Sequence, residues 1–227
     1  MSNVETILGP PSNAFKWMRR YVRFNNGRCS RGVTKIIRRI FASNYRFKQL
    51  NRTTFGSMSR RVSKRFGTRV DTAIDHWVRG LRVKEQHVRS MVKQLEQWSW
   101  RPVTSQLVVA RPLWRLATRI DLIVLDTLHD VLLLIEVKTG CPYRHESNGK
   151  MMRFIRPQIY NSMLHQHQLQ AVLSAALFSY TYPNCTYAVE PALLYMNHDG
   201  SLDLFRESQF QVHFNESIEQ VLIGTSS

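Results

Sequence analysis

Two stretches of the chain have apolar residues at the three- and four-residue spacing of an amphipathic helix. The first spans residues 67–98, and its apolar positions are Val70, Ile74, Trp77, Val78, Val88, Met91, Val92 and Leu95. Gly80 is expected to divide this stretch into two helices, and Pro102 follows its end. The second stretch spans residues 158–180, and Pro183 lies just beyond it. We therefore predict helices over both stretches.

Shorter apolar runs between and after these helices predict β-strands. They cover residues 103–110, 119–125, 131–139, 188–196 and 202–205. Polar residues predict turns at 126–130 and 197–200, a loop over 140–157, and a short final helix is expected over 217–223. The order helix, three strands, helix, two strands predicts an α/β fold with a mixed central β-sheet flanked by helices.

Several classes of protein are not expected from this sequence. It has no run of about 18 apolar residues that would span a membrane, and no apolar segment typical of a secretory signal near its start. Three widely spaced cysteines, Cys29, Cys141 and Cys185, predict neither a disulfide framework nor a four-cysteine metal site. A glycine-rich phosphate loop and a nucleophile elbow are both missing. We expect an intracellular protein from a reducing compartment, with no membrane partner.

Positive charge is concentrated in the first third of the chain. The 227 residues have a formal net charge of +16, and residues 1–69 contain 17 of the 32 Lys and Arg but one of the 16 Asp and Glu. Aromatic residues are interleaved with these cations, and together they suit phosphates and bases. We predict a basic nucleic-acid-contacting region over residues 1–65 and a second domain over 66–227. A solvated basic arm and a mitochondrial targeting segment are the alternatives.

The residues that suggest chemistry lie on two neighbouring predicted strands. Residues two apart on a strand share a face, so Glu136 and Lys138 project together. If the strands pair about the turn at 126–130, Asp121 lies near Glu136. Two carboxylates on an apolar sheet suit a hard ion such as Mg²⁺ or Mn²⁺, with the lysine beside them. The other interpretation is an edge-strand ion pair between Glu136 and Lys138 beside an exposed Asp121.

Four segments resemble the PD-(D/E)XK nuclease superfamily, and they occur in the family's order. The likeness is closest to the branch with RecB-type nuclease domains, lambda exonuclease-like enzymes and mitochondrial genome-maintenance exonucleases, and it covers about residues 66–206. The matching segments are the glycine-led helix that starts Phe66-Gly67, the Asp motif Arg119-Ile-Asp121-Leu, the Glu-x-Lys motif Glu136-Val-Lys138-Thr-Gly140, and the glutamine helix around Gln168. The resemblance implies a restriction-endonuclease-like core and a PD-(D/E)XK nuclease domain over 66–227.

The resemblance also implies a role for each residue in these motifs. Asp121 and Glu136 would be metal ligands, the Val137 carbonyl would be a backbone ligand, and Lys138 would be the catalytic lysine. Gln168 would contact the metal-bound water or the scissile phosphate, and it is preferred to Gln170 because a small residue, Ala171, then falls where the family has one. Two positions depart from the pattern, since Gln106 stands where many relatives have a glutamate and Val172 stands where an aromatic residue is expected.

Several further side chains have either a possible role in binding nucleic acid or a structural role. Arginines ahead of the first helix and in the Asp motif are candidate nucleic-acid ligands: Arg60, Arg61, Arg65 and Arg119. His165 and His167 lie two apart on a predicted helix, so they should face different directions and have surface or packing roles. Asp71 and Asp75 lie four apart on one helix face, either as a minor part of the site or in solvent.

The function expected from these features is that of a Mg²⁺-dependent (or Mn²⁺-dependent) deoxyribonuclease, most simply an exonuclease that trims DNA ends in replication, recombination or repair. Its partner would be DNA, with no small-molecule cofactor beyond the metal, and it would act in a nucleus or mitochondrion, or as a viral protein in a host cell. Two alternatives stay open. One is a non-catalytic nucleic-acid-binding protein on a degenerate nuclease fold, and the other is a structure-specific endonuclease.

Overall fold

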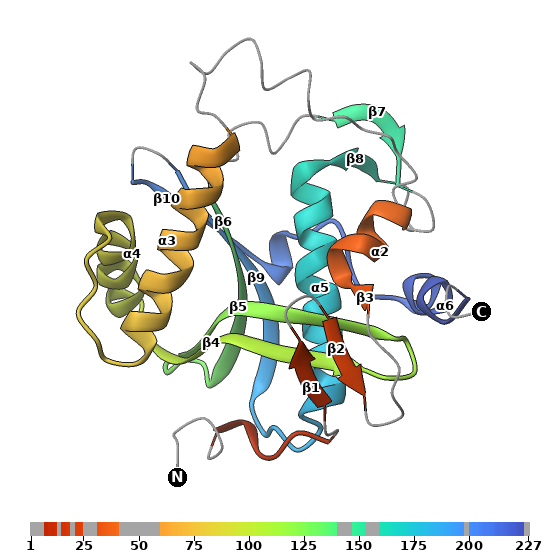
Figure 1. Cartoon of the computed structure of the whole chain (residues 1–227), viewed down its shortest axis with the longest axis horizontal. Helices are drawn as coiled ribbons and strands as arrows, with labels where there is room; N and C mark the ends of the chain where they lie inside the picture. The colour runs from red at the N-terminus through yellow and green to blue at the C-terminus, as the bar shows by residue number, and fades with distance from the viewer. Residues whose placement is uncertain are drawn as a thin grey trace.

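The computed structural model describes residues 7–12, 15–18, 21–24, 31–40, 60–139, 147–152, 159–197 and 200–224. Its helices and strands follow the chain in the order β1 (Phe15–Met18), β2 (Tyr21–Phe24), β3 (Arg31–Gly32), α2 (Val33–Ile40), α3 (Arg60–Val78), α4 (Gln86–Gln97), β4 (Trp100–Arg111), β5 (Leu116–Asp126), β6 (Val131–Thr139), β7 (Ser147–Met151), β8 (Tyr160–Ser162), α5 (Met163–Thr181), β9 (Ala188–Met196), β10 (Leu202–Arg206), the 3₁₀ turn η2 (Glu207–Gln209) and α6 (Glu216–Gly224) (Figure 1).

A mixed β-sheet forms the centre of the molecule. Its strands lie in the order β10-β9-β6-β5, and β5 also pairs with β4 and β3. The hairpins β4–β5, β5–β6 and β9–β10 are antiparallel, whereas β6 pairs with β9, and β3 with β5, in parallel. The parallel pair β6–β9 is joined through α5, the connection that such a pair requires. The predicted α/β fold with a mixed sheet flanked by helices is confirmed.

One edge of β5 is shared between two partners. The pairing with β6 runs from Asp126 back to Leu122, and the pairing with β3 involves only Leu116 and Ala117. Residues 118–121 of β5 therefore lie between the two pairings, on the side where β6 continues toward its own end. This interruption of the ladder is where the polar residues of the sheet gather.

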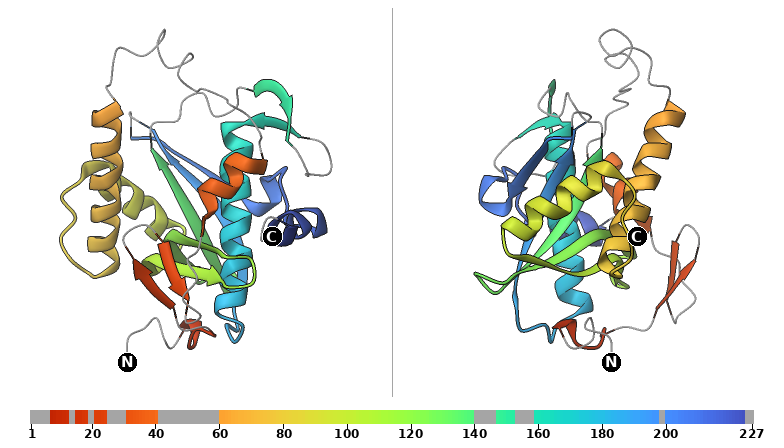
Figure 2. Two further views of the ribbon diagram at one scale, coloured as in Figure 1. Left: turned by 45° about the vertical axis from the view of Figure 1, so that its right-hand side comes forward. Right: turned by 90° about the vertical axis from the view of Figure 1, so that its left-hand side faces the viewer.

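Helices cover both faces of the sheet and give two separate apolar cores. Along β6 the side chains alternate, so that Leu132 and Leu134 belong to the core under α5 and α2 while Leu133 and Ile135 belong to the core under α3 and α4. Figure 2 shows the sheet between these two helical layers. This alternation sends Glu136 and Lys138, which continue the even-numbered positions, toward the α5 side.

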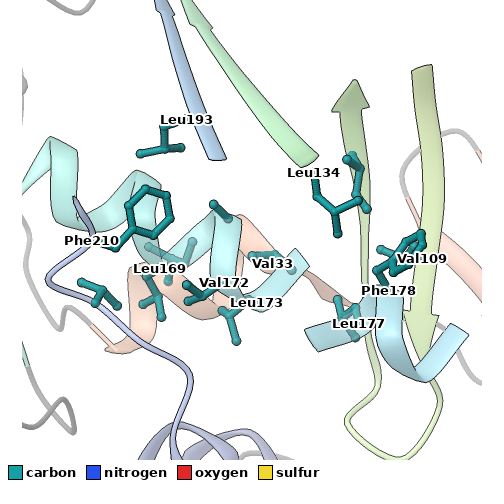
Figure 3. Packing of buried hydrophobic residues seen from close by; sticks show 14 of the residues in the cluster. Val33, Val109, Leu134, Leu169, Val172, Leu173, Leu177, Phe178, Leu193 and Phe210 are labelled. Carbon is teal, nitrogen blue, oxygen red and sulfur yellow. The ribbon is translucent and has the colours of Figure 1, made fainter. Parts of the chain in front are cut away.

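The larger core is built mainly from α5. Apolar side chains of this helix pack against strands and against α2, as Figure 3 shows for Leu169, Phe178, Leu134 and Val33. Burying such aliphatic and aromatic groups contributes about 1.5–3 kcal/mol each to folding. None of the helices in the described part of the chain is long and apolar enough to cross a membrane.

Most predicted elements are observed, with shifted ends. The strands expected at 131–139 and 188–196 match β6 and β9, and Gly80 follows α3, ending it with a φ of +69° that glycine adopts readily. The helix expected from residue 158 begins instead at Met163. Ser162 caps it, because the serine Oγ accepts a hydrogen bond from the amide of His165. The polar loop expected over 140–157 contains the short strand β7, which pairs with β8.

The basic N-terminal third contributes to the core as well. β3 joins the central sheet beside β5, and α2 buries Val33, Ile36 and Ile37 under α5. The helix α3 begins at Arg60, within the segment assigned to the N-terminal region. The division at residues 65 and 66 thus stays a prediction about function, while the packing joins the two segments.

Candidate active site

The polar cluster lies where the β5–β6 pairing ends and the β4–β5 pairing skips one residue pair. Pairing between β4 and β5 passes from Ser105–Leu122 to Leu107–Ile120, leaving Gln106 and Asp121 opposite each other and outside the pairing. Gln106 has a φ of +54° within the strand. The β5–β6 pairing ends at Leu122 and Ile135, one residue before Asp121 and Glu136. The strands thereby deliver these side chains to one place in the sheet.

Asp121 is held by the backbone of the neighbouring strand. Its Oδ2 accepts a hydrogen bond from the amide of Val137 at 3.0 Å, and its Oδ1 lies 3.5 Å from the side-chain nitrogen of Gln106. Burial, followed by repulsion from the Glu136 carboxylate, raises the pKa of Asp121 well above its usual value, against the opposing effects of Lys138 and the Val137 amide. The site therefore favours any cation that approaches this carboxylate.

Glu136, Lys138 and Gln170 form a connected triad beside Asp121. The Lys138 Nζ lies 2.5 Å from Glu136 Oε1 and 3.1 Å from the side-chain oxygen of Gln170, and the Gln170 amide donates to Glu136 Oε1 at 2.6 Å. Glu136 is 5% exposed, so these donors offset the cost of burying its carboxylate. The helix α5 thus positions an amide against both catalytic candidates of β6.

A third carboxylate faces the cluster from α3. The pKa of Asp71 is raised by burial and by the charge of Glu136, and lowered by Lys138 and Arg119, which places it in the same electrostatic environment. Asp75, one turn later, instead accepts a hydrogen bond from Ser105 and pairs with Arg79. Of the two acids considered from the sequence, Asp71 is the one that acts on the cluster.

The helix α3 approaches the end of β6 closely at a glycine. A Cβ added to Gly67 would lie 3.6 Å from the Oγ1 of Thr139, an ordinary van der Waals contact. β6 runs between α3 and α5 in Figure 1, so the two helices flank the strand that contributes Glu136 and Lys138. The Phe66-Gly67 and Lys138-Thr139 segments, more than 70 residues apart in sequence, therefore meet at the site.

The choice of Gln168 as the site glutamine is corrected by the structure. Gln168 is 1% exposed, and its side-chain oxygen accepts a hydrogen bond from the backbone amide of Gln211. Two positions along a helix amount to about 200° of rotation, so Gln168 and Gln170 point in nearly opposite directions. Gln170 is the residue that contacts Glu136 and Lys138.

The candidate nucleic-acid ligands lie in two places. Arg119 is close to the cluster, since its Nη1 donates to the Gln106 side-chain oxygen at 3.4 Å. Arg60, Arg61 and Arg65 lie in the first two turns of α3, and Arg65 is exposed. The side chains of Arg60 and Arg61 are outside the described part of the structure, as are Cys29, Cys141 and the loop residues 140–146.

The two histidines of α5 face different neighbours, as expected from their spacing. His165 Nδ1 lies 2.5 Å from the carbonyl oxygen of Tyr160, whereas His167 Nδ1 lies 2.8 Å from the hydroxyl of Tyr195. Burial and the nearby Lys138 ammonium hold the pKa of His167 well below its usual value, so its ring is neutral at pH 7. Both rings have packing and hydrogen-bonding roles here.

The alternative interpretation, an edge-strand ion pair beside an exposed aspartate, agrees with the structure only in part. Glu136 and Lys138 do form an ion pair, and at these two residues β6 pairs with β9 alone, because its pairing with β5 ends at Ile135. Asp121 is half-buried and hydrogen-bonded across to β6. Because the side chains of Lys138 and Glu136 are only 18% and 6% exposed, this ion pair is unlike a solvated surface pair.

The donor atoms at this place fit a magnesium-like ion. Mg²⁺ is commonly bound by one or two carboxylates together with waters and phosphate oxygens, and the cluster offers Asp121, Glu136 and the adjoining backbone carbonyl of Val137. Within the described ranges, no group of three or more His, Cys, Asp or Glu side chains lies close enough together to hold a metal ion. An ion here would therefore depend on water and substrate oxygens for most of its coordination.

Comparisons of this chain with protein-family models, with curated proteins and with solved structures found no match.

Proposed function

We propose that the protein is a Mg²⁺- or Mn²⁺-dependent deoxyribonuclease with a restriction-endonuclease-like core, and that it trims DNA ends. The observation that supports this most directly is the meeting of Asp121, Glu136 and Lys138 at the interrupted β5–β6 ladder. These are the residues that the PD-(D/E)XK resemblance assigns to metal binding and catalysis. The excess positive charge in residues 1–69 supports a nucleic acid as the substrate.

Each side chain of the cluster has a distinct role in this proposal. Asp121 and Glu136 would hold the cation together with the Val137 carbonyl. A divalent cation bound there would neutralise charge on the scissile phosphate and lower the pKa of a bound water. The Lys138 ammonium, with Gln170 fixing its direction, would place a hydrogen-bond donor against the attacking water or the phosphate oxygens.

The surrounding charges suit a substrate that arrives as an anion. Lys138 and Arg119 oppose the carboxylates of Asp71, Asp121 and Glu136, so the bare cluster has one more acid than base. A divalent cation would reverse that balance and make the site attractive to a phosphodiester. We therefore expect DNA cleavage to require the metal ion, even though the positively charged side chains of Lys138 and Arg119 are already present.

The test is cleavage of end-labelled linear DNA and of covalently closed circular DNA, with Mg²⁺ or with EDTA. We expect metal-dependent loss of linear DNA, and a decrease of about 100-fold or more for Glu136→Gln and for Lys138→Ala, because each removes a charge that acts on the reacting phosphate. Matched controls are Glu96→Gln and Lys93→Ala on the exposed surface of α4, which should cleave as the wild type does.

The same experiment separates the remaining functions. Cleavage of the circle would identify an endonuclease, since an exonuclease needs an end. Tight DNA binding in anisotropy measurements, with no cleavage in either metal, would contradict the enzyme and leave a nucleic-acid-binding protein on this fold. Gln106, an amide where many PD-(D/E)XK nucleases have an acid, is the feature that favours this second function. Parallel RNA substrates would show whether the sugar is recognised.

A further inference from the structure

Gln106 has a backbone conformation that is unusual for its place in the fold. Four described residues other than glycine have a positive φ, namely Ser99, Gln106, Arg115 and Asp130. Three of them lie in turns, at residues 98–99, 112–115 and 127–130, but Gln106 lies inside β4 at +54°. A long side chain pays a conformational cost there, and such strain gathers at functional sites.

The strained backbone turns the Gln106 side chain toward two charged groups of β5. Its Nε2 lies 3.5 Å from Asp121 Oδ1, and its Oε1 lies 3.4 Å from Arg119 Nη1. The glutamine amide can donate to a carboxylate and accept from a guanidinium at once, whereas a glutamate would accept from the arginine but repel the aspartate. The glutamine therefore lies between an acid and a base that are two positions apart on one strand.

Without this amide, the opposite charges of Arg119 and Asp121 would attract each other directly. A guanidinium that pairs with Asp121 would occupy the oxygens that a cation needs, and its own donors would be turned away from an incoming phosphate. The Gln106 side chain thus affects both the proposed metal ligand, Asp121, and the candidate phosphate ligand, Arg119, although the amide itself has no charge.

We propose that Gln106 is a positioning residue that separates Arg119 from Asp121, so that the aspartate is kept for the cation and the arginine for the anionic substrate. This inference rests on the proposed metal site, and it extends that site to a residue outside the Asp and Glu-x-Lys motifs. On this inference, the glutamine that stands where many PD-(D/E)XK nucleases have a glutamate arranges the charges of the site. It is then not a sign that the site has lost its function.

The experiment measures Mn²⁺ binding by calorimetry and thermal unfolding in the full chain. The variants are Gln106→Gly, Arg119→Ala and the double variant, with Ser99→Gly as the matched control, since it places glycine at another positive φ in a turn. Gln106→Gly should unfold at the wild-type temperature or above it, because glycine accepts the backbone. It should bind Mn²⁺ about threefold to tenfold more weakly, a size typical of coupled neighbours.

The double variant tests the route of the effect. If Gln106 acts by separating Arg119 from Asp121, glycine at 106 should change Mn²⁺ affinity little once Arg119 is alanine. Wild-type Mn²⁺ affinity in Gln106→Gly, an equal loss in the Arg119→Ala background, or no Mn²⁺ binding by the wild type would each overturn the inference. Mn²⁺ binding that follows the expected pattern without DNA cleavage would support it while contradicting the nuclease.

Discussion

At the scale of single residues, the site depends on which amide of α5 faces the sheet. Gln168 and Gln170 have the same side chain and lie two positions apart, yet one bonds to the backbone at Gln211 and the other to Glu136. Nothing in the local sequence distinguishes them, because the direction of a helix face is decided by packing against the sheet. The sequence led us to expect Asp121 near Glu136 and Lys138, as the structure has them, but the glutamine beside them is Gln170 and not the Gln168 that we preferred.

These two glutamines make a matched pair for mutation. Gln170→Ala should reduce DNA cleavage by about tenfold or more with little change in stability, because Glu136 and Lys138 lose their positioning partner. Gln168→Ala should lower the free energy of unfolding by about 1–3 kcal/mol, since the Gln211 amide loses its acceptor, and should leave the cleavage rate of folded protein unchanged. Urea unfolding and single-turnover cleavage measure the two effects, and the reversed pattern would restore Gln168 to the site.

Residue-level strain was also invisible in the sequence. Periodicity predicts a strand over residues 103–110, but it does not reveal the positive φ at Gln106, which occurs where the β4–β5 pairing skips the Gln106–Asp121 position. Asp71 is a related case, because its spacing on α3 is equally compatible with solvent. Its charge contributes to the raised pKa of Asp121, which only the three-dimensional placement of α3 beside the sheet reveals.

At the scale of secondary structure, the hydrophobic pattern predicted most of the core elements. It succeeded best for β6 and β9, whose apolar runs are buried on both sides, as expected for strands in the interior of a sheet. It failed at the start of α5, because Ile159 lies four residues before Met163 and fits the helical spacing, although residues 160–162 form β8. The helix begins where the Ser162 Oγ accepts a hydrogen bond from the His165 amide, a contact that periodicity does not reveal.

That boundary gives a prediction about α5. Ser162→Ala should lower the free energy of unfolding by about 1 kcal/mol, because the amide of His165 loses the serine Oγ that caps the helix. Ser179→Ala is the control within the same helix, since this serine is exposed and bonds only to a carbonyl one turn before it. Chemical unfolding measures both variants, and an equal effect of the two would contradict a capping role for Ser162.

At the scale of the whole molecule, the N-terminal third contains basic residues at which we expect ligand contact and apolar residues that pack in the core. Its many arginines and lysines predict contact with a polyanion, whereas β3 and the buried side of α2 are part of the central α/β structure. The concentration of charge predicted contact with a polyanion, but it did not predict that this segment also packs in the core. Pairing between residues as distant as Arg31 and Leu116 cannot be inferred from local patterns.

The contribution of α2 to the core can be measured directly. Ile36→Ala should lower the free energy of unfolding by about 2–4 kcal/mol, because this side chain is 2% exposed and packs under α5. Thr34→Ala, an exposed position of the same helix, should change stability by less than about 0.5 kcal/mol. Equal stability of the two variants would show that the N-terminal region folds apart from the sheet.

The hydrogen bond between Asp121 and the Val137 amide has a consequence for how the Asp motif would be retained in evolution. One carboxylate oxygen replaces a backbone carbonyl at the point where the β5–β6 ladder stops, so it completes the sheet as well as facing the cluster. If the proposed nuclease activity is correct, selection for folding alone would therefore retain this aspartate in a descendant that had lost the activity. Lys138 and Gln170 bond to side chains of the cluster, so on the same proposal their loss, rather than that of Asp121, should mark the first step of such a decay.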